Sequence, residues 1–215
     1  MKVIAEVKRR SPSRGEINAH LDPASRAREY IEGGAAAISV LTEPAYFGGS
    51  EDDLLKVRAA IHAPVLRKDF IIDDAQLIES RAWGASAVLL IARALPRAAL
   101  ASLANSAREW GIEPLIEVRS ESELDAALGS GARVIGVNSR DLETLEVDAT
   151  VIERLIPQVP DVVVAIAESG MRDRADVERA ARVGADAVLV GSALSDAGEG
   201  AVAVRNLARV TRRDR

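Results

Sequence analysis

One pattern repeats along the whole chain of 215 residues, and it restricts the possible folds more than any other feature. An amphipathic helical segment is followed by a glycine breaker, and then by an apolar run rich in Val and Ile that ends in polar residues. A glycine at such a point allows the left-handed conformation that commonly ends a helix. The breakers are Gly33-Gly34-Ala35, Gly84-Ala85, Gly111, Gly131-Ala132 and Gly184-Ala185.

The alternation predicts eight strands, each followed by a helix. We expect the strands at residues 3–8, 36–42, 63–68, 85–91, 112–117, 133–138, 162–168 and 186–191. No linker or shift in composition divides the chain, so we expect one α/β domain over residues 1–215, a closed (β/α)8 TIM barrel. A doubly wound open sheet is the alternative. It usually has fewer strands, and no GxGxxG motif follows any strand here.

Composition excludes several classes of function. The net charge is −5 with both signs interspersed, which argues against a general nucleic-acid surface. There is no cysteine, and His20 and His62 are isolated, so we expect neither a metal site nor thiol chemistry. No apolar run approaches the roughly 18 residues of a membrane-spanning helix. We therefore expect a cytoplasmic protein with no membrane or nucleic-acid partner.

Charged side chains collect at the carboxyl ends of the predicted strands. Active sites of such barrels lie at that end, and the period of two places Leu115 and Glu117 on one face of their strand. Each charge alone could be a solvated strand end or half of a structural ion pair. Several at the same end favour a functional cluster. The residues in question are Glu6, Lys8, Lys68, Glu117 and Glu168, with the polar Asn138 beside them.

Such a cluster suits general acid–base chemistry, in which a lysine donates a proton to a carbonyl and a glutamate takes one. The same lysine could instead form a Schiff base, as in aldolases. The spacing of the residues does not separate these two uses.

A second signal follows the last two strands. Ser169-Gly170 and Gly191-Ser192 place small residues where backbone N–H groups can approach an anion. Tight turns alone would explain one such pair. Because barrels often bind phosphate with these two loops, the two pairs together predict a phosphate site.

Taken together, these residues resemble the indole-3-glycerol phosphate synthase family. The resemblance covers essentially the whole chain through ordered blocks: "AEVKRRSPSRG", "LTEPAYFGGS", "LRKDFIID", "PLIEV", "GVNSRDLETLEVD", "AESGM" and "VLVGSAL". It implies a carbon–carbon lyase of tryptophan biosynthesis that closes 1-(2-carboxyphenylamino)-1-deoxyribulose 5-phosphate to an indole, with loss of carbon dioxide and water. It implies a small phosphorylated substrate and no cofactor.

The resemblance also implies roles for the charged residues. Lys68 matches the general acid that protonates the ketone, and Glu117 matches the general base of the dehydration. Glu6 matches the carboxylate that orients them, and Lys8 a residue that binds phosphate and takes part in proton transfer. The catalytic set that it implies is Glu6, Lys8, Lys68, Glu117, Asn138 and Glu168.

The remaining matched positions surround the substrate. Phe47 in particular matches a side chain that borders the aromatic ring. The implied substrate-binding residues are Ser11, Phe47, Phe70, Arg140 and Ser169. The implied phosphate-binding residues are Lys8, Gly170, Gly191 and Ser192.

Members of the family usually carry some forty or more residues before the first strand, including a helix that covers the mouth of the barrel. Here Met1 lies almost at the first strand, so we expect that helix to be missing from the sequence. A shortened or engineered barrel that binds phosphate ligands with little or no turnover is therefore an alternative, preferred to the Schiff-base aldolase. Uncovered apolar surface favours self-association, so we expect a monomer or a weak homo-oligomer.

Overall fold

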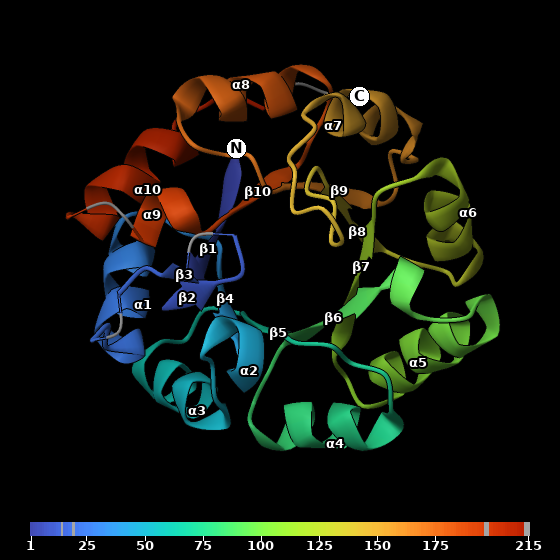
Figure 1. Ribbon diagram of the computed structural model, residues 1–215, viewed down its shortest axis with the longest axis horizontal. Coiled ribbons are helices and arrows are strands. Elements are labelled where there is room, and N and C mark those ends of the chain that lie inside the picture. Colours follow the sequence, from blue (N-terminus) through green and yellow to red (C-terminus); the bar gives the residue numbers. More distant parts are fainter. Residues whose placement is uncertain (14, 19, 196–197, 213–215) are drawn as a thin grey trace.

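A computed structural model describes residues 1–13, 15–18, 20–195 and 198–212 of the chain. Eight parallel strands form a closed barrel in which each strand pairs with the next, and the last pairs with the first (Figure 1). The predicted barrel is confirmed, and the open doubly wound sheet is wrong. The barrel strands are β1 (Lys2–Val7), β4 (Ala37–Leu41), β5 (Val65–Lys68), β6 (Ala87–Ile91), β7 (Glu113–Val118), β8 (Val134–Asn138), β9 (Val164–Glu168) and β10 (Ala187–Val190).

Helices surround the strands as an outer ring (Figure 1). The longer ones are α1 (Pro23–Glu32), α3 (Glu51–Ala60), α4 (Asp74–Ala82), α5 (Arg97–Glu109), α6 (Glu121–Gly129), α7 (Thr150–Leu155), α8 (Arg174–Arg182) and α10 (Gly200–Ala208). Shorter turns are α2 (Pro44–Phe47), α9 (Ser192–Ser195) and the 3-10 helices η1 (Ala92–Ala94) and η2 (Ile156–Gln158). No helix within the described ranges is long and apolar enough to cross a membrane.

Local sequence signals account for the helix ends. The side chain of Asp22 accepts a hydrogen bond from the backbone N–H of Ser25 and caps α1, whose first residue is Pro23. At the other end of α1, Gly34 has a φ of 95°, and after α4 Gly84 has a φ of 84°. These are left-handed conformations that side chains with a Cβ adopt only with strain, so glycine ends these helices and turns the chain into the next strand.

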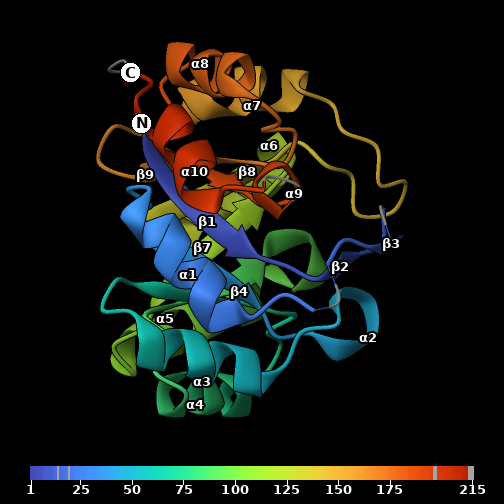
Figure 2. The ribbon, with the colours of Figure 1, turned by 90° about the vertical axis from the view of Figure 1, so that its left-hand side faces the viewer.

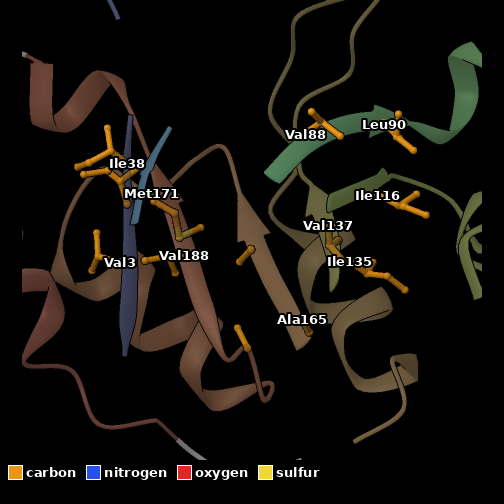
Figure 3. Close-up of a cluster of buried hydrophobic side chains, with 14 of the residues drawn as sticks. Val3, Ile38, Val88, Leu90, Ile116, Ile135, Val137, Ala165, Met171 and Val188 are labelled. Atoms are coloured by element: carbon orange, nitrogen blue, oxygen red, sulfur yellow. The ribbon is translucent and has the colours of Figure 1, made fainter. Parts of the chain in front are cut away.

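The alternation of the strands divides the apolar residues into two cores. Outward-facing residues such as Val3, Ile38 and Ile116 pack under the helices and are fully buried (Figure 3). Inward-facing residues such as Leu66 and Leu115 fill the barrel itself as a separate cluster. Their neighbours in that interior cluster are Leu89, Ile91, Ile166, Ala187 and Leu189. Because both faces of each strand are covered, a charged side chain is tolerated only near a strand end or with a partner.

A small hairpin that the sequence did not indicate follows β1. Strands β2 (Arg10–Ser11) and β3 (Gly15–Glu16) pair in antiparallel fashion. Arg9, just before them, donates a 2.8 Å hydrogen bond from Nη2 to Asp53 Oδ1 of α3, which ties the hairpin to the outer ring. Figure 2 shows the hairpin, α2 and the loop after β8 projecting from the same side of the molecule. This side is the carboxyl end of the barrel strands.

Candidate active site

Five charged side chains from four barrel strands and the turn after β1 meet at this end of the barrel. Glu117 and Glu168 are only 4% and 1% exposed. They lie on the inward face two residues beyond Leu115 and Ile166, which belong to the interior cluster. A cavity of about 860 Å3 opens above them. All five charged residues line this cavity: Glu6, Lys8, Lys68, Glu117 and Glu168.

The two ammonium groups are each held by carboxylates. Lys68 Nζ lies 3.5 Å from Glu117 Oε2 and 3.4 Å from Glu168 Oε2, so it bridges β7 and β9 from its place at the end of β5. Lys8 Nζ lies 2.8 Å from Glu6 Oε1. With three carboxylates and two ammonium groups in one buried cluster, each charge depends on its neighbours for compensation.

The carboxylates keep Lys68 charged. Burial by itself would lower the pKa of Lys68, but attraction to Glu168, Glu117 and Glu6 outweighs it and raises the pKa above its usual value. The lysine is therefore an ammonium over the whole neutral range. It is available as a donor to an oxygen atom, and its amine is not free as a nucleophile.

The carboxyl groups of Glu168 and Glu6 differ in their proton affinity. Burial raises the pKa of Glu168 to about 7, partly opposed by Lys68 and reinforced by the nearby charge of Glu117. Burial also acts on Glu6, but Lys8 and Lys68 outweigh it and lower the pKa of that carboxyl below its usual value. Glu6 is thus a permanent anion at neutral pH, whereas Glu168 gains or loses a proton close to neutrality.

Polar groups at the rim are arranged by backbone contacts. Asn138 Oδ1 accepts a 2.9 Å hydrogen bond from the N–H of Arg140, and Arg140 Nη1 donates a 2.6 Å bond to the carbonyl of Leu145. Burial lowers the pKa of Arg140, partly opposed by the negative charge of Glu6. Ser11 Oγ is buried in the cavity wall without a hydrogen-bond partner among the described residues. Its hydroxyl is available to a bound polar group.

The turn after β9 and the end of β10 form one side of the cavity. Ser169 has a φ of 63° and Gly170 a φ of 69°, so two consecutive residues are left-handed. Ser169 adopts this conformation although it has a Cβ, which stores strain at the rim. Gly191 faces the charged cluster so closely that a Cβ there would lie 2.2 Å from Glu6 Oε1. Ser192, the first residue of α9, completes this side.

Two aromatic rings stand at the opposite side of the mouth. The ring centroids of Phe47 and Phe70 are 6.5 Å apart and the rings are tilted by 44°. Phe70 is 42% exposed. Every site residue that the sequence pointed to thus lines the same cavity, from Glu6 on β1 to Ser192 after β10.

A buried network behind Lys68 was not expected from the sequence. Arg67 is only 4% exposed and points away from the barrel interior, with its guanidinium 4.1 Å from the ring centroid of Trp83. Its Nη2 lies 3.1 Å from Asp69 Oδ2, which also accepts a 2.6 Å bond from Thr42 Oγ1. Arg67 Nη1 also donates a 2.9 Å hydrogen bond to the carbonyl of Gln76. The two neighbours of Lys68 in the chain are therefore anchored to the residue after β4 and to α4. The string "RKD" was the available signal, but alternation alone does not reveal the partners of an outward arginine.

Of the loop after β8 only Arg140 was expected at the site, and the rest of the loop and the apolar floor of the cavity were missed. The loop lies beside the mouth because of contacts within itself: Asp141 Oδ1 accepts bonds from the backbone N–H groups of Glu143 and Thr144. No periodic pattern marks such a loop in the sequence. Further lining residues that were not expected are Leu41, Leu89, Ile91, Leu142, Leu145, Val147, Met171 and Leu189.

This arrangement combines three chemical capabilities. Lys68 can donate a proton or hydrogen bond beside two carboxylates that can accept one. The small residues after β9 and β10 leave room for an anion, with Lys8 nearby. The aromatic and apolar walls can hold a flat ring.

Comparisons with known proteins agree with one another. The family model described as indole-3-glycerol phosphate synthase matches residues 1–207 of this chain. The indole-3-glycerol phosphate synthase of Kineococcus radiotolerans is 55% identical over 194 residues, which cover 90% of this chain and 71% of that protein. Indole-3-glycerol phosphate synthase 1 of Streptomyces coelicolor is 52% identical over 207 residues, or 96% of this chain and 77% of the relative.

Solved structures support the fold. The chain superposes on 3-hexulose-6-phosphate synthase from Salmonella typhimurium with a TM-score of 0.76, covering 98% of both chains. The two sequences are only 17% identical, so the likeness concerns the barrel and not the chemistry.

Proposed function

The chain belongs to the indole-3-glycerol phosphate synthase family, carboxy-lyases of tryptophan biosynthesis, and from this premise we propose how its residues carry out the ring closure. The substrate is a small phosphorylated molecule with an aromatic carboxylate at one end and a ketone in the middle. One observation carries the assignment of roles. Lys68 Nζ lies between Glu117 and Glu168, in a cavity that is also lined by both loops proposed to hold the phosphate.

Binding places the three parts of the substrate against three parts of the cavity. The phosphate lies against Gly170, Gly191 and Ser192, with Lys8 as its counter-charge. The aromatic carboxylate and amine face Arg140 and the unpartnered hydroxyl of Ser11. Asn138 and Ser169 make further polar contacts to the substrate. Phe47 and Phe70 pack against its aromatic ring.

Ring closure begins at the ketone. The aromatic carbon that bears the carboxylate attacks the ketone carbon, and Lys68 transfers a proton to the ketone oxygen as the new carbon–carbon bond forms. The bond to the carboxylate then breaks, carbon dioxide leaves, and its electron pair restores the aromatic ring. The raised pKa of Lys68 supports this role because it keeps the ammonium loaded before each cycle.

Dehydration completes the indole. The new hydroxyl leaves as water, and Glu117 takes a proton from the methylene carbon beside the nitrogen. Lys8, paired with Glu6 at 2.8 Å, is the second ammonium of the site and the donor proposed for the leaving hydroxyl. Glu168 orients Lys68 from the side opposite Glu117.

The charge of Lys68 also disfavours the Schiff-base alternative. Amine nucleophiles of that class need a lowered pKa, whereas that of Lys68 is raised. Borohydride should therefore trap no adduct between the protein and the substrate ketone.

Turnover of the anthranilate-linked ribulose phosphate, followed by the fluorescence of the indole product, tests the proposal. Glu117→Gln should lower kcat by about 100-fold or more with the fold retained, because the amide cannot accept the proton. Glu109→Gln, an exposed position on α5, serves as the matched control and should leave kcat unchanged. Normal turnover in Glu117→Gln would refute the assigned base.

We further propose a cytoplasmic protein that is a monomer or a weak homo-oligomer and binds no nucleic acid. The net charge of −5 supports the last point. Exposed apolar side chains at the mouth, Tyr46 at 59% and Phe70 at 42%, support weak self-association. Light scattering over a concentration series tests it, and a stable dimer at nanomolar concentration would contradict it.

A further inference from the structure

We infer that Gly136 of β8 is a positioning residue for the reaction, because its missing side chain leaves the space that the Glu168 carboxylate occupies beside Lys68. The inference deepens the proposed function and rests on the role that it gives to the cluster of Lys68, Glu117 and Glu168.

The space at Gly136 is filled by the carboxylate itself. A Cβ built on Gly136 would lie 1.9 Å from Glu168 Oε1 and 3.0 Å from Glu168 Cδ. Separations this short between non-bonded atoms are not tolerated, so an alanine at position 136 would force the carboxylate to move. Leu115 Cδ1, at 3.3 Å, is the next atom, and it is the flexible end of a side chain that a small shift would accommodate.

The register of the barrel places Gly136 beside Glu117 and two residues before the partner of Glu168. It pairs with Glu117 of β7 on one side and with Ile166 of β9 on the other. The next inward-facing residue of β8, Asn138, pairs with Glu168. The carboxylate of Glu168 therefore leans down over Gly136 toward the centre of the barrel, where it meets Lys68.

Backbone conformation does not explain the glycine. Gly136 is not among the glycines of the described chain with a positive φ, so any residue could adopt its backbone angles. Glycine in a strand interior weakens the strand and often marks a close approach by another group. Here the approaching group is the carboxylate of Glu168.

The present position of the Glu168 carboxylate gives it its contact to Lys68. The residue is 1% exposed, and its Oε2 lies 3.4 Å from Lys68 Nζ. Oε1, the atom over Gly136, is buried without a hydrogen-bond partner. No hydrogen bond fixes this oxygen, so its position depends on the shape of the space around it. Filling that space would rotate the carboxylate away and leave Lys68 with Glu117 as its close anion.

Gly136→Ala tests the inference, with Gly129→Ala as the matched control. Gly129 is exposed at the end of α6, and a Cβ there would meet nothing within 4 Å. We expect Gly136→Ala to lower kcat by about 10- to 100-fold with KM changed less than about threefold, since the change affects the orientation of a group in the chemical step. Gly129→Ala should match the wild type in both constants.

A double-mutant cycle with Glu168→Ala separates positioning from general damage to the barrel. If Gly136 acts through the carboxylate, Gly136→Ala in the Glu168→Ala background should change neither kcat nor the midpoint of thermal unfolding further. Equal losses from Gly136→Ala in both backgrounds would overturn the inference, as would full activity of the single variant. If the single variant does not fold, a folded double variant supports the inference and an unfolded one overturns it.

The same cycle distinguishes failure of the proposed function. Normal kcat in Glu168→Ala would refute the role given to Glu168, and with it any positioning through that residue. Reduced kcat in Glu168→Ala beside normal kcat in Gly136→Ala would instead leave the role of Glu168 intact and overturn only the inference about Gly136.

Discussion

Two successive layers of side chains inside the barrel are equally buried and chemically opposite. The lower layer includes Leu115 and Ile166, each 3% exposed. Two residues further along the same strands, the upper layer holds Glu117 at 4% and Glu168 at 1%. Lys68, two residues beyond Leu66, joins them. The exposed fraction of a side chain therefore does not distinguish the core from the site. The lower layer is stabilised by apolar contacts, whereas each charge of the upper layer is stabilised by an opposite charge.

This comparison shows how one architecture carries both stability and chemistry. The lower layer stabilises the barrel through close packing, so its loss should reduce the free energy of unfolding. In the upper layer each charged side chain is stabilised by its oppositely charged neighbours, and these neighbours shift its pKa. Substitutions in the two layers should therefore affect different quantities.

The largest effect is expected in the upper layer from Lys68→Met. We expect kcat/KM to fall by about 1,000-fold or more, because the proposed proton donor is lost while a side chain of similar length remains. Steady-state kinetics and circular dichroism check activity and fold together. Lys56→Met, at an exposed site on α3, is the control for loss of a lysine and should stay within about twofold of the wild type. Wild-type turnover in Lys68→Met would refute the proposal that Lys68 is the proton donor.

The corresponding change in the lower layer is Leu66→Ala. Truncation of a leucine that is 3% exposed leaves a cavity, and we expect the free energy of unfolding to fall by about 2–5 kcal/mol. Because Leu66 does not line the active-site cavity and is not among the atoms nearest the space over Gly136, kcat of the folded fraction should stay within about threefold. Urea unfolding and kinetics on the same sample check both. A large loss of kcat with unchanged stability would erase the distinction between the layers.

A smaller effect, dependent on pH, is expected from Glu168→Gln. The folded pKa of about 7 lies above the ordinary value of 4.5, so between these values folded Glu168 keeps a proton that the unfolded chain has lost. Its contribution to stability is full below about pH 4.5 and is lost as the pH rises through 7. The glutamine cannot ionise, so the variant should equal the wild type at pH 4 and exceed it at pH 8 by about 1–3 kcal/mol. Urea unfolding at the two pH values checks this, and parallel stability curves for the two proteins would contradict it.

The smallest effect is expected behind the upper layer, from Asp69→Asn. The carboxylate accepts the hydroxyl of Thr42 at 2.6 Å and pairs with Arg67 at 3.1 Å, so the amide should weaken the anchor of the loop after β5. We expect a loss of about 1–2 kcal/mol in the free energy of unfolding and a kcat reduced by less than about tenfold. Asp125→Asn, exposed on α6, is the control in thermal unfolding and kinetics. No change in either quantity would show that the network does not position Lys68.

Much of the fold could be predicted from the sequence because its signals are local. Glycines such as Gly84 and Gly184 mark helix ends, and apolar runs of β-branched residues mark strands. Both ends of every barrel strand therefore lie within about two residues of the predicted ends. The charged positions of the site were recognisable because they break the apolar pattern of a strand that is buried on both faces. Glu117 and Glu168 stand out for this reason.

The features that were missed depend on contacts between distant segments or are too short to show a pattern. Arg67 is buried by Trp83 and α4, and nothing beside it in the sequence indicates those partners. The hairpin of β2 and β3 is too short to show a period. From the sequence, Gly136 is only a glycine that weakens its strand. The structure shows that the carboxylate of Glu168, 32 residues later, occupies the space beside it.

We propose that the ring closes at the upper layer, and a crystal structure with a bound substrate analogue tests this most directly. An analogue whose ketone is reduced to an alcohol binds without reacting. We expect the alcohol oxygen within about 3.2 Å of Lys68 Nζ and the phosphate against Gly170, Gly191 and Ser192. An alcohol oxygen held far from Lys68, or a phosphate bound away from these two loops, would contradict it.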